Sequence, residues 1–199
     1  MTSSQIQTTN QNVKQDTNVV QDVDVNNNIQ ILQITPETLR ALVEFGVSHE
    51  MAERISRERF EECYQANTIL KHSDESSHQH GIYTIEYFPK DIDHDPEVVR
   101  KNLESLGFQV DLKSPNVQGM PTNAIWFGHD VPISVVKLVA LTLVRAGVAL
   151  QTIKPFVHSD NESEWARLIQ IGSDGDYSES AVLTASFINS QTEFRRDDE

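Results

Sequence analysis

Hydrophobic and polar positions along the chain predict alternating strands and helices. The densest apolar stretch is Thr122–Val157, whose pattern is strand, helix, strand. Asn123–Phe127 is a short apolar run with two aromatic residues, typical of a buried strand. Ile133–Ala146 is long enough for a helix and is followed by a glycine, which commonly ends one. Ala149–Phe156 then predicts the next strand, so we expect one strand–helix–strand unit here.

A similar unit precedes it. Ile82–Phe88 is rich in aromatic and β-branched residues and predicts a strand. Asp95 is placed to cap a helix over Pro96–Leu106, with proline in the first helical position. Phe108–Lys113 alternates apolar with polar residues and predicts a half-buried strand. Farther along the chain, Trp165–Gly172 predicts one more strand.

This order of elements predicts the fold class. Strand, helix, strand, strand, helix, strand, with an added strand at the end, is the order of a ferredoxin-like βαββαβ sandwich. That is an α+β fold in which two helices cover one face of an antiparallel sheet. The two halves share a rhythm, because each helix ends in Leu-Gly or Ala-Gly before the second strand. We therefore predict a ferredoxin-like domain over residues 81–190, followed by a charged tail over 191–199.

The segment before this domain predicts a helical hairpin over residues 35–71. Thr35–Pro36 is suited to begin a first helix, and Gly46 to end it. Ser48 then caps a second helix that we expect to continue to about Leu70. The apolar face of this second helix is incomplete, so we expect the hairpin to pack on the main domain or to self-associate.

Residues 1–34 form a polar arm rich in Gln, Asn and Thr, without any aromatic residue, Gly or Pro. Such low hydrophobicity predicts disorder, because too little apolar surface can be buried to offset the ordering entropy. An alternative stays open, since Val23, Val25, Ile29 and Ile31 alternate with polar residues as in a strand. In that case the arm would add a strand to another subunit or to a partner.

Residues 72–80 predict a polar linker between the hairpin and the main domain. His72, His78 and His80 within it raise the alternative of metal binding. A stable metal site requires fixed ligand geometry, and no predicted strand holds these histidines in place. We therefore expect neither a metal nor a cofactor.

Composition narrows the classes of function. The formal net charge of -14 disfavours general binding to nucleic acid or to an anionic membrane, because phosphates would be repelled. No apolar run approaches the roughly 20 residues needed to span a bilayer. The polar amino-terminal stretch lacks the apolar centre of a signal peptide. The single cysteine, Cys63, excludes an intrachain disulfide. We therefore expect an acidic cytoplasmic protein.

Four segments carry a family resemblance: IYTIEYFPKD, VVRKNLESLGFQVDLK, TNAIWFGHD and VVKLVALTLVRAGVALQTIKPF. In their order of strands and helices they resemble the small domains at the carboxyl end of LytR-type proteins and the SPOR domains. The resemblance covers roughly residues 82–157 and implies a ferredoxin-like fold. SPOR domains bind cell-wall glycan outside the membrane, whereas this chain shows no export signal. The segments are also similar to accessory domains of large bacterial signalling or defence proteins, which implies a regulatory role.

Gly128, His129 and Asp130 form the most site-like cluster in the sequence, where a strand ends and a helix begins. Backbone N–H groups at a helix start can hold an anion, so this corner could bind a small anionic ligand or a nucleotide. The alternative is that Asp130 caps the helix and Pro132 starts it. A metal-dependent hydrolase would combine this corner with the acidic loop Asp91–Asp95. No Walker loop, nucleophile elbow or dinucleotide-binding glycine motif is present, and we predict no catalytic residue.

The helix predicted over residues 133–146 is more apolar than one sheet requires. Its polar residues gather into one stripe, and the rest, roughly 220° of its circumference, is apolar. We expect a second contact, made either by the helices of residues 36–70 or by another subunit. The predicted interface residues are Val135, Leu138, Val139 and Leu143, together with Trp126.

These features favour a non-enzymatic cytoplasmic protein that serves in interaction or oligomerisation, as an accessory or regulatory component. Its expected partner is another protein or a second copy, and we expect neither nucleic acid nor a membrane span. A small-ligand sensor that uses the His129–Asp130 corner is the alternative function, and a metal-dependent hydrolase is the third.

Overall fold

The computed structural model describes six ranges of the chain: 35–72, 77–90, 94–114, 120–157, 165–177 and 179–195. Of residues 77–79 only the backbone is described. The polar arm of residues 1–34, the acidic residues Asp91 and Asp93, and the end of the predicted tail lie outside these ranges. Strand addition by the arm therefore stays a prediction.

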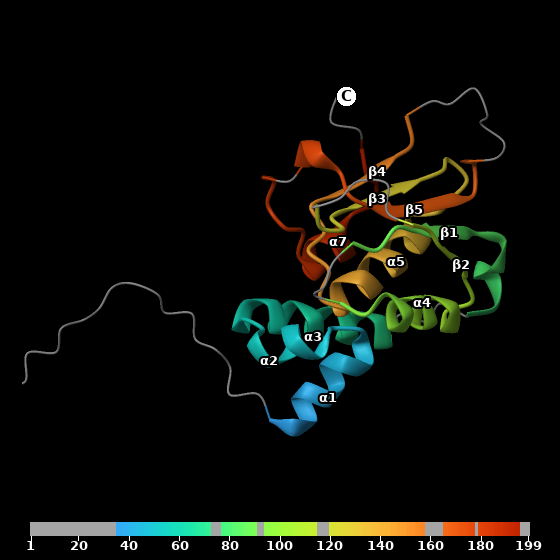
Figure 1. The fold of residues 1–199 in the computed structure, drawn as a ribbon. Helices are drawn as coiled ribbons and strands as arrows, with labels where there is room; N and C mark the ends of the chain where they lie inside the picture. Colours follow the sequence, from blue (N-terminus) through green and yellow to red (C-terminus); the bar gives the residue numbers. More distant parts are fainter. Residues whose placement is uncertain are drawn as a thin grey trace, which may run out of the picture.

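Within these ranges, five short strands form one mixed sheet (Figure 1). They are β1 (Thr84–Tyr87), β2 (Gln109–Leu112), β3 (Ala124–Phe127), β4 (Thr152–Pro155) and β5 (Leu168–Gly172). Their order across the sheet is β2-β1-β5-β3-β4. β1 is parallel to both of its neighbours, β2 and β5, whereas β3 is parallel to β4 and antiparallel to β5.

The predicted α+β class is confirmed, but the predicted ferredoxin-like order is not what the sheet shows. A split βαβ sheet is antiparallel, with another strand between the two that a helix joins. Here the strands joined by a helix are direct parallel neighbours. β5, predicted as a strand added after the βαββαβ order without a place in the sheet, occupies its centre. The reason is burial: Ile169 lies opposite Ile85, Ile171 lies opposite Ile125, and all four side chains are fully buried.

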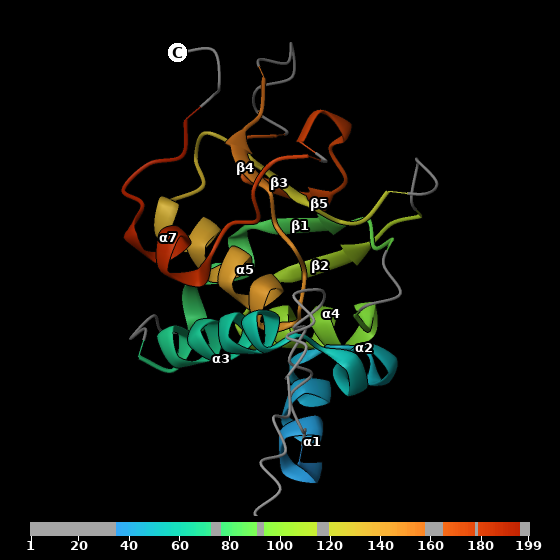
Figure 2. The same ribbon diagram turned by 90° about the vertical axis from the view of Figure 1, so that its left-hand side faces the viewer.

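Two helices connect the parallel pairs of strands. α4 (Pro96–Ser105) joins β1 to β2, and α5 (Ile133–Arg145) joins β3 to β4. The two units run in opposite directions and extend toward opposite edges of the sheet. Crossovers of the usual right-handed sense then place both helices on the same face. Figure 2 shows α4 and α5 together below the sheet.

The amino-terminal helices form a second layer under α5. They are α1 (Pro36–Phe45), α2 (His49–Arg54) and α3 (Arg57–His72), as Figures 1 and 2 show. α3 packs directly on α5, and α7 (Ala185–Ser190) contacts both helices. Two short 3-10 helices, η1 (Ser77–Ile82) and η2 (Gly175–Tyr177), complete the described elements.

The second helix of the predicted hairpin is divided in two, so the prediction of one continuous helix to about Leu70 is wrong. Ile55 interrupts it with φ -59° and ψ 134°, and its side chain is fully buried. Ser56 restarts the helix, because its Oγ accepts a hydrogen bond from the Arg59 N–H at 3.3 Å. Ser56, a residue type that favours the N-cap, is the sequence feature that indicates the break.

The predicted caps at Thr35, Ser48 and Asp95 are confirmed, because each side chain accepts a hydrogen bond from a backbone N–H in the first turn of the following helix. Thr184 caps α7 in the same way. Gly46 ends α1 in the left-handed region, with φ 105°, where an L side chain would be strained. These bonds satisfy backbone groups that a helix end leaves without partners.

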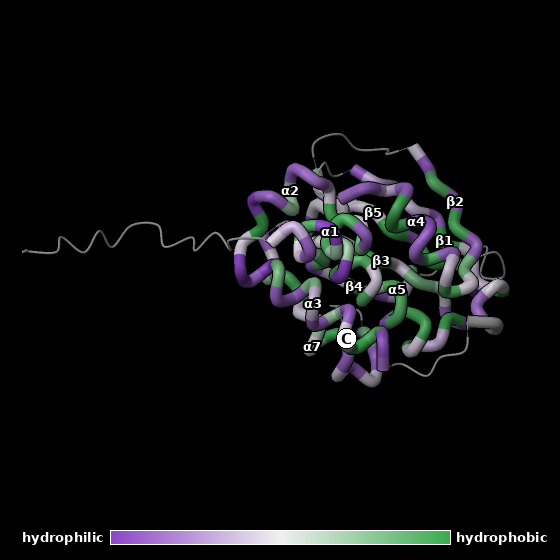
Figure 3. Tube along the Cα trace, turned by 90° about the horizontal axis from the view of Figure 1, so that it is seen from below, coloured by the Kyte–Doolittle hydropathy of each residue, from purple (hydrophilic) through white to green (hydrophobic). Residues whose placement is uncertain are grey.

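α5 lies at the centre of the main hydrophobic core. Its buried side chains pack with those of the sheet and with Leu103 of α4 and Ile188 of α7. A smaller apolar cluster holds α1, α2 and α3 together, with Leu42, Ile55 and Cys63 fully buried. In Figure 3 the trace of α5 is largely green, while α2 and α3 carry more purple. The hairpin thus has a small core of its own and reaches the main core through α3.

Candidate functional site

The Gly128–Asp130 corner follows β3, with Gly128 buried and both His129 and Asp130 exposed. The side chains of His129 and Asp130 are 65% and 52% exposed, and His129 Nε2 lies 3.5 Å from Asp130 Oδ1. The Asp130 N–H donates to the Ala166 carbonyl at 2.9 Å, and the Gly128 N–H donates to Leu168 at the same distance. The backbone donors of Gly128 and Asp130 therefore continue the pairing of β3 with β5 and do not point at a ligand.

Asp130 does not cap α5, so that alternative is wrong. The N-cap residue of α5 is Pro132, and no side chain bonds to the first turn. Gly128 is required for a different reason, since a Cβ there would overlap the carbonyl oxygens of Trp165 and Ala166. Gly128 and Asp130 hold two backbone segments together, and ligand binding at this corner stays a prediction.

The predicted interface residues of α5 lie inside the protomer. Val135, Leu138, Val139 and Leu143 are at most 5% exposed. α3 and α7 cover the side of α5 that faces away from the sheet. Of the two alternatives for the second contact, the helices of residues 36–70 are the one that the structure shows. The surplus of apolar residues in α5 is therefore explained without another subunit.

Trp126 does not share that surface. Its neighbours in β3, Ile125 and Phe127, are buried on the helix-covered face, so Trp126 points to the opposite face. There its ring lies against Gly172, 3.4 Å from where a Cβ would stand. Trp126 thus belongs to the face of the sheet that α4 and α5 leave uncovered.

His72, His80 and Cys63 lie in separate environments. Within the described ranges, no group of three or more His, Cys, Asp or Glu residues could hold a metal ion. His80 is buried and stacks on Phe108 at 5.0 Å between ring centroids, whereas His72 is exposed at the end of α3. Burial raises the pKa of the Cys63 thiol to about 11. A thiol with such a pKa is protonated near neutral pH and is a poor nucleophile.

The uncovered face of the sheet carries a row of paired polar side chains. Gln170 Nε2 donates to Glu86 Oε2 at 2.7 Å. Lys113 Nζ lies 3.5 Å from Glu86 Oε1 and 2.5 Å from Asp111 Oδ2. Bonding to Asp111 is the main cause that raises the pKa of Lys113. The row runs toward the β2 edge and ends there with one acid and one base, Asp111 and Lys113.

The two edges of the sheet differ. The β4 edge contains Pro155, which has no N–H to offer. The chain around residues 180–183 also lies beside the start of β4, because the Leu183 N–H donates to the Leu150 carbonyl at 2.7 Å. The Phe156 N–H donates to Phe127 of β3, so the backbone of Pro155 faces outward. Proline and the adjacent chain both protect this edge against a further strand.

Among the described residues, the β2 edge has neither a proline nor an adjacent paired segment on its outer side. The Lys113 N–H donates to the Tyr87 carbonyl of β1 at 2.8 Å. Since every second residue of a parallel strand bonds the same neighbour, the backbone groups of Val110 and Leu112 face away from β1. In the part of the chain that the structure describes, no strand pairs with this outer side of β2. β2 contains no proline.

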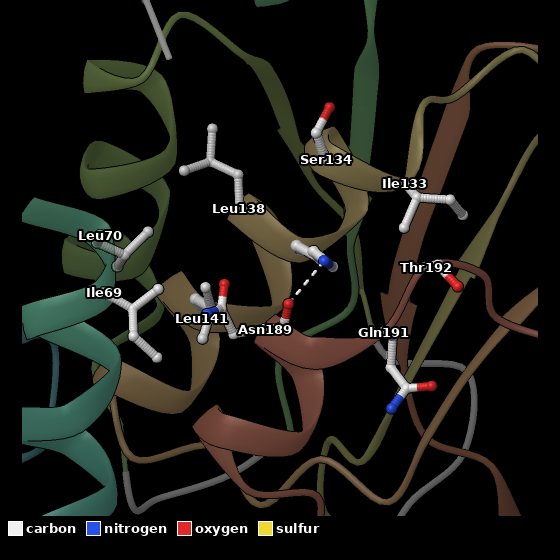
Figure 4. A pocket seen from close by; sticks show the side chains of 10 residues that line it. Ile69, Leu70, Ile133, Ser134, Leu138, Leu141, Asn189, Gln191 and Thr192 are labelled. Carbon is white, nitrogen blue, oxygen red and sulfur yellow. Dashed lines mark hydrogen bonds between the residues drawn. The ribbon is translucent and has the colours of Figure 1, made fainter. Parts of the chain in front are cut away.

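A groove of about 410 Å³ lies between α3, α5 and α7 (Figure 4). Its apolar lining comes from Ile69 and Leu70 of α3 and from Ile133, Leu138 and Leu141 of α5. These residues are far apart in the sequence, so no local pattern pointed to the groove.

Lys137 supplies a cation to this groove. Its Nζ donates to the carbonyl oxygen of Asn189 at 2.7 Å, the bond drawn dashed in Figure 4. An ammonium group has three N–H donors, so this bond leaves capacity for an anionic group. Ser134 and Thr192 add hydroxyl groups to the lining. An apolar floor beside a cation suits an amphiphilic carboxylate.

Comparisons with protein-family models, with curated proteins and with solved structures find no match to this chain. Function must therefore be argued from the geometry. No helix within the described ranges is both long and apolar enough to cross a membrane.

Proposed function

We propose that this protein is a non-enzymatic interaction module that joins another polypeptide by accepting a strand at the β2 edge of its sheet. One observation carries the proposal, the contrast between the two edges. Pro155 and the neighbouring chain protect β4, whereas Val110 and Leu112 direct their backbone groups outward from β2. Natural proteins usually protect an edge strand unless something pairs with it.

In strand addition, main-chain hydrogen bonds provide the affinity and side chains beside the added strand provide the specificity. The outward N–H and C=O groups of Val110 and Leu112 would form the main-chain bonds of the added strand. Asp111 and Lys113 stand on the uncovered face beside it and select the charges of the incoming side chains. The module contributes binding and no chemistry. Such a role fits an accessory or regulatory component, as the resemblance to bacterial signalling or defence proteins implies.

A photo-crosslinking experiment tests this function. A benzoylphenylalanine replaces the exposed Gln109 on β2 in the full chain, and in a matched control it replaces the exposed Lys101 on α4. Irradiation of cells should give a discrete adduct with one polypeptide from position 109 and none from position 101. Mass spectrometry identifies the polypeptide, which is either a second copy or another protein. Absence of an adduct at position 109, or equal adducts at both positions, would overturn the proposed function.

The groove beside Lys137 supports a second candidate function, that of a small-ligand sensor. Its cation and apolar floor predict binding of a medium-chain carboxylate. Octanoate should raise the melting temperature of the wild-type chain, and octylamine should not. Lys137→Met should abolish the rise while Lys101→Met keeps it. An equal rise in wild type and in Lys137→Met would exclude the groove as the site.

A further inference from the structure

The sequence of β2 is self-complementary around Leu112. Asp111 precedes it and Lys113 follows it, and both side chains stand on the uncovered face with Asp111 Oδ2 and Lys113 Nζ 2.5 Å apart. A two-fold axis through Leu112 would therefore bring each acid opposite the base of the other copy. Two-fold interfaces require such self-complementary patches.

Backbone geometry restricts how two β2 strands can pair antiparallel. The residues that face outward must meet as hydrogen-bonded pairs. Three registers give both Val110 and Leu112 an outward-facing partner within residues 108–114, with the axis at Val110, at Asp111 or at Leu112. Each register places different side chains opposite each other, so charge and bonding decide between them.

Two of the three registers are unfavourable. With the axis at Val110, Phe108 would have to bond Leu112 of the other copy, but the Phe108 N–H already donates to the Leu103 carbonyl. With the axis at Asp111, two carboxylates would stand directly opposite each other, which is destabilising.

The third register has the axis at Leu112. It makes two cross-strand pairs of Asp111 with Lys113, and Val110 bonds Ser114 of the other copy. Opposite charges directly across an antiparallel pair are stabilising. Lys113 keeps its contact with Glu86 of its own chain in this arrangement, 3.5 Å away on the same face.

We infer that the strand accepted at the β2 edge is β2 of a second copy, in the antiparallel register centred on Leu112. The inference rests on the proposed function and names its partner. The two sheets then join into one continuous sheet, and both exposed edges become central. The remaining outer edges are those of β4, which Pro155 protects, so the assembly stops at a dimer.

Charge reversal tests the register in the full chain. Asp111→Lys places a lysine opposite Lys113 of the other copy, and Lys113→Asp places an aspartate opposite Asp111. Each variant alone should lose self-association by about tenfold or more in sedimentation equilibrium. Mixed together, the two variants should form a one-to-one heterodimer, because every cross-strand pair then joins opposite charges. Asp111→Ser is the matched control for loss of the charge alone and should weaken the wild-type dimer less than Asp111→Lys does.

The outcomes separate this inference from the proposed function. A wild-type chain that stays monomeric, or a dimer that both reversals leave unchanged, overturns the inference. Heterodimer formation in the mixture cannot come from damage to folding, so it supports pairing of β2 with β2. Loss of self-association by Lys113→Asp alone distinguishes the register centred on Leu112 from the one centred on Asp111, in which residue 113 stands opposite Gln109. If the wild type stays monomeric while Gln109 crosslinks to another protein in cells, strand addition holds and only the second copy is wrong. If Gln109 gives no adduct and the chain is monomeric, both fail.

Discussion

Gly128 and Trp165 approach so closely that a Cβ on Gly128 would overlap the Trp165 carbonyl oxygen. This approach lets β3 continue along β5 through the bonds of Gly128 and Asp130. Gly128→Ala should therefore destabilise the protein by about 3 kcal/mol, because backbone would have to move against backbone. Urea denaturation followed by circular dichroism measures the change. Gly81→Ala is the matched control, since its Cβ would meet only the Gly107 carbonyl at 3.6 Å. Equal stability of the two variants would contradict the close packing of β3 on β5.

Lys154 and Asp174 form an ion pair at 2.8 Å with side chains that are 19% and 12% exposed. The Lys154 Nζ also stands 4.4 Å from the centre of the Tyr177 ring. Lys154→Met should cost about 2–3 kcal/mol, because it leaves a mostly buried carboxylate without its partner. The double variant with Asp174→Asn should recover part of that loss, which a double-mutant cycle in urea measures. Additive effects of the two substitutions would show that the pair is not coupled.

Cys63 predicts a change of stability at alkaline pH. Burial raises the pKa of its thiol from 9.0 to about 11 in the folded protein. The contribution of Cys63 to stability is therefore fully present below pH 9. Above pH 9 the unfolded thiol ionises while the folded one stays protonated, so this contribution falls by about 2–3 kcal/mol by pH 11. The difference between wild type and Cys63→Ala isolates this effect from other titrating groups. A difference that stays constant from pH 8 to 11 would exclude a buried, protonated thiol.

Local signals predicted the elements well. The caps at Thr35 and Asp95 and the glycine at position 46 act within one turn of the chain, so the sequence is enough to place them. The alternation of Phe108–Lys113 likewise matches β2. The order of the strands was beyond such signals, because alternation in β5 does not say which strands lie beside it. Central placement follows from Ile169 and Ile171, which are buried between β1 and β3.

In the candidate sites, too, residue types can be read from the sequence, whereas the roles of the residues depend on distant parts of the chain. Gly128, His129 and Asp130 were singled out by residue type, but their role depends on the backbone of residues 165–168, which is distant in the sequence. The charges of Asp111 and Lys113 could be read from the sequence. Their importance comes from the position of β2 at an open edge, which only the assembled sheet reveals.

The most direct test of strand addition blocks the backbone of the β2 edge. A matched control variant loses a similar part of the side chain but keeps the backbone N–H. Val110→Pro removes the outward N–H of β2, as Pro155 does in β4, and Val110→Ala removes a similar amount of packing but keeps the N–H. Each variant carries the crosslinker at position 109, and circular dichroism checks that both fold. We predict an adduct in Val110→Ala and none in Val110→Pro. Equal adduct yields in the two folded variants would contradict strand addition at the β2 edge.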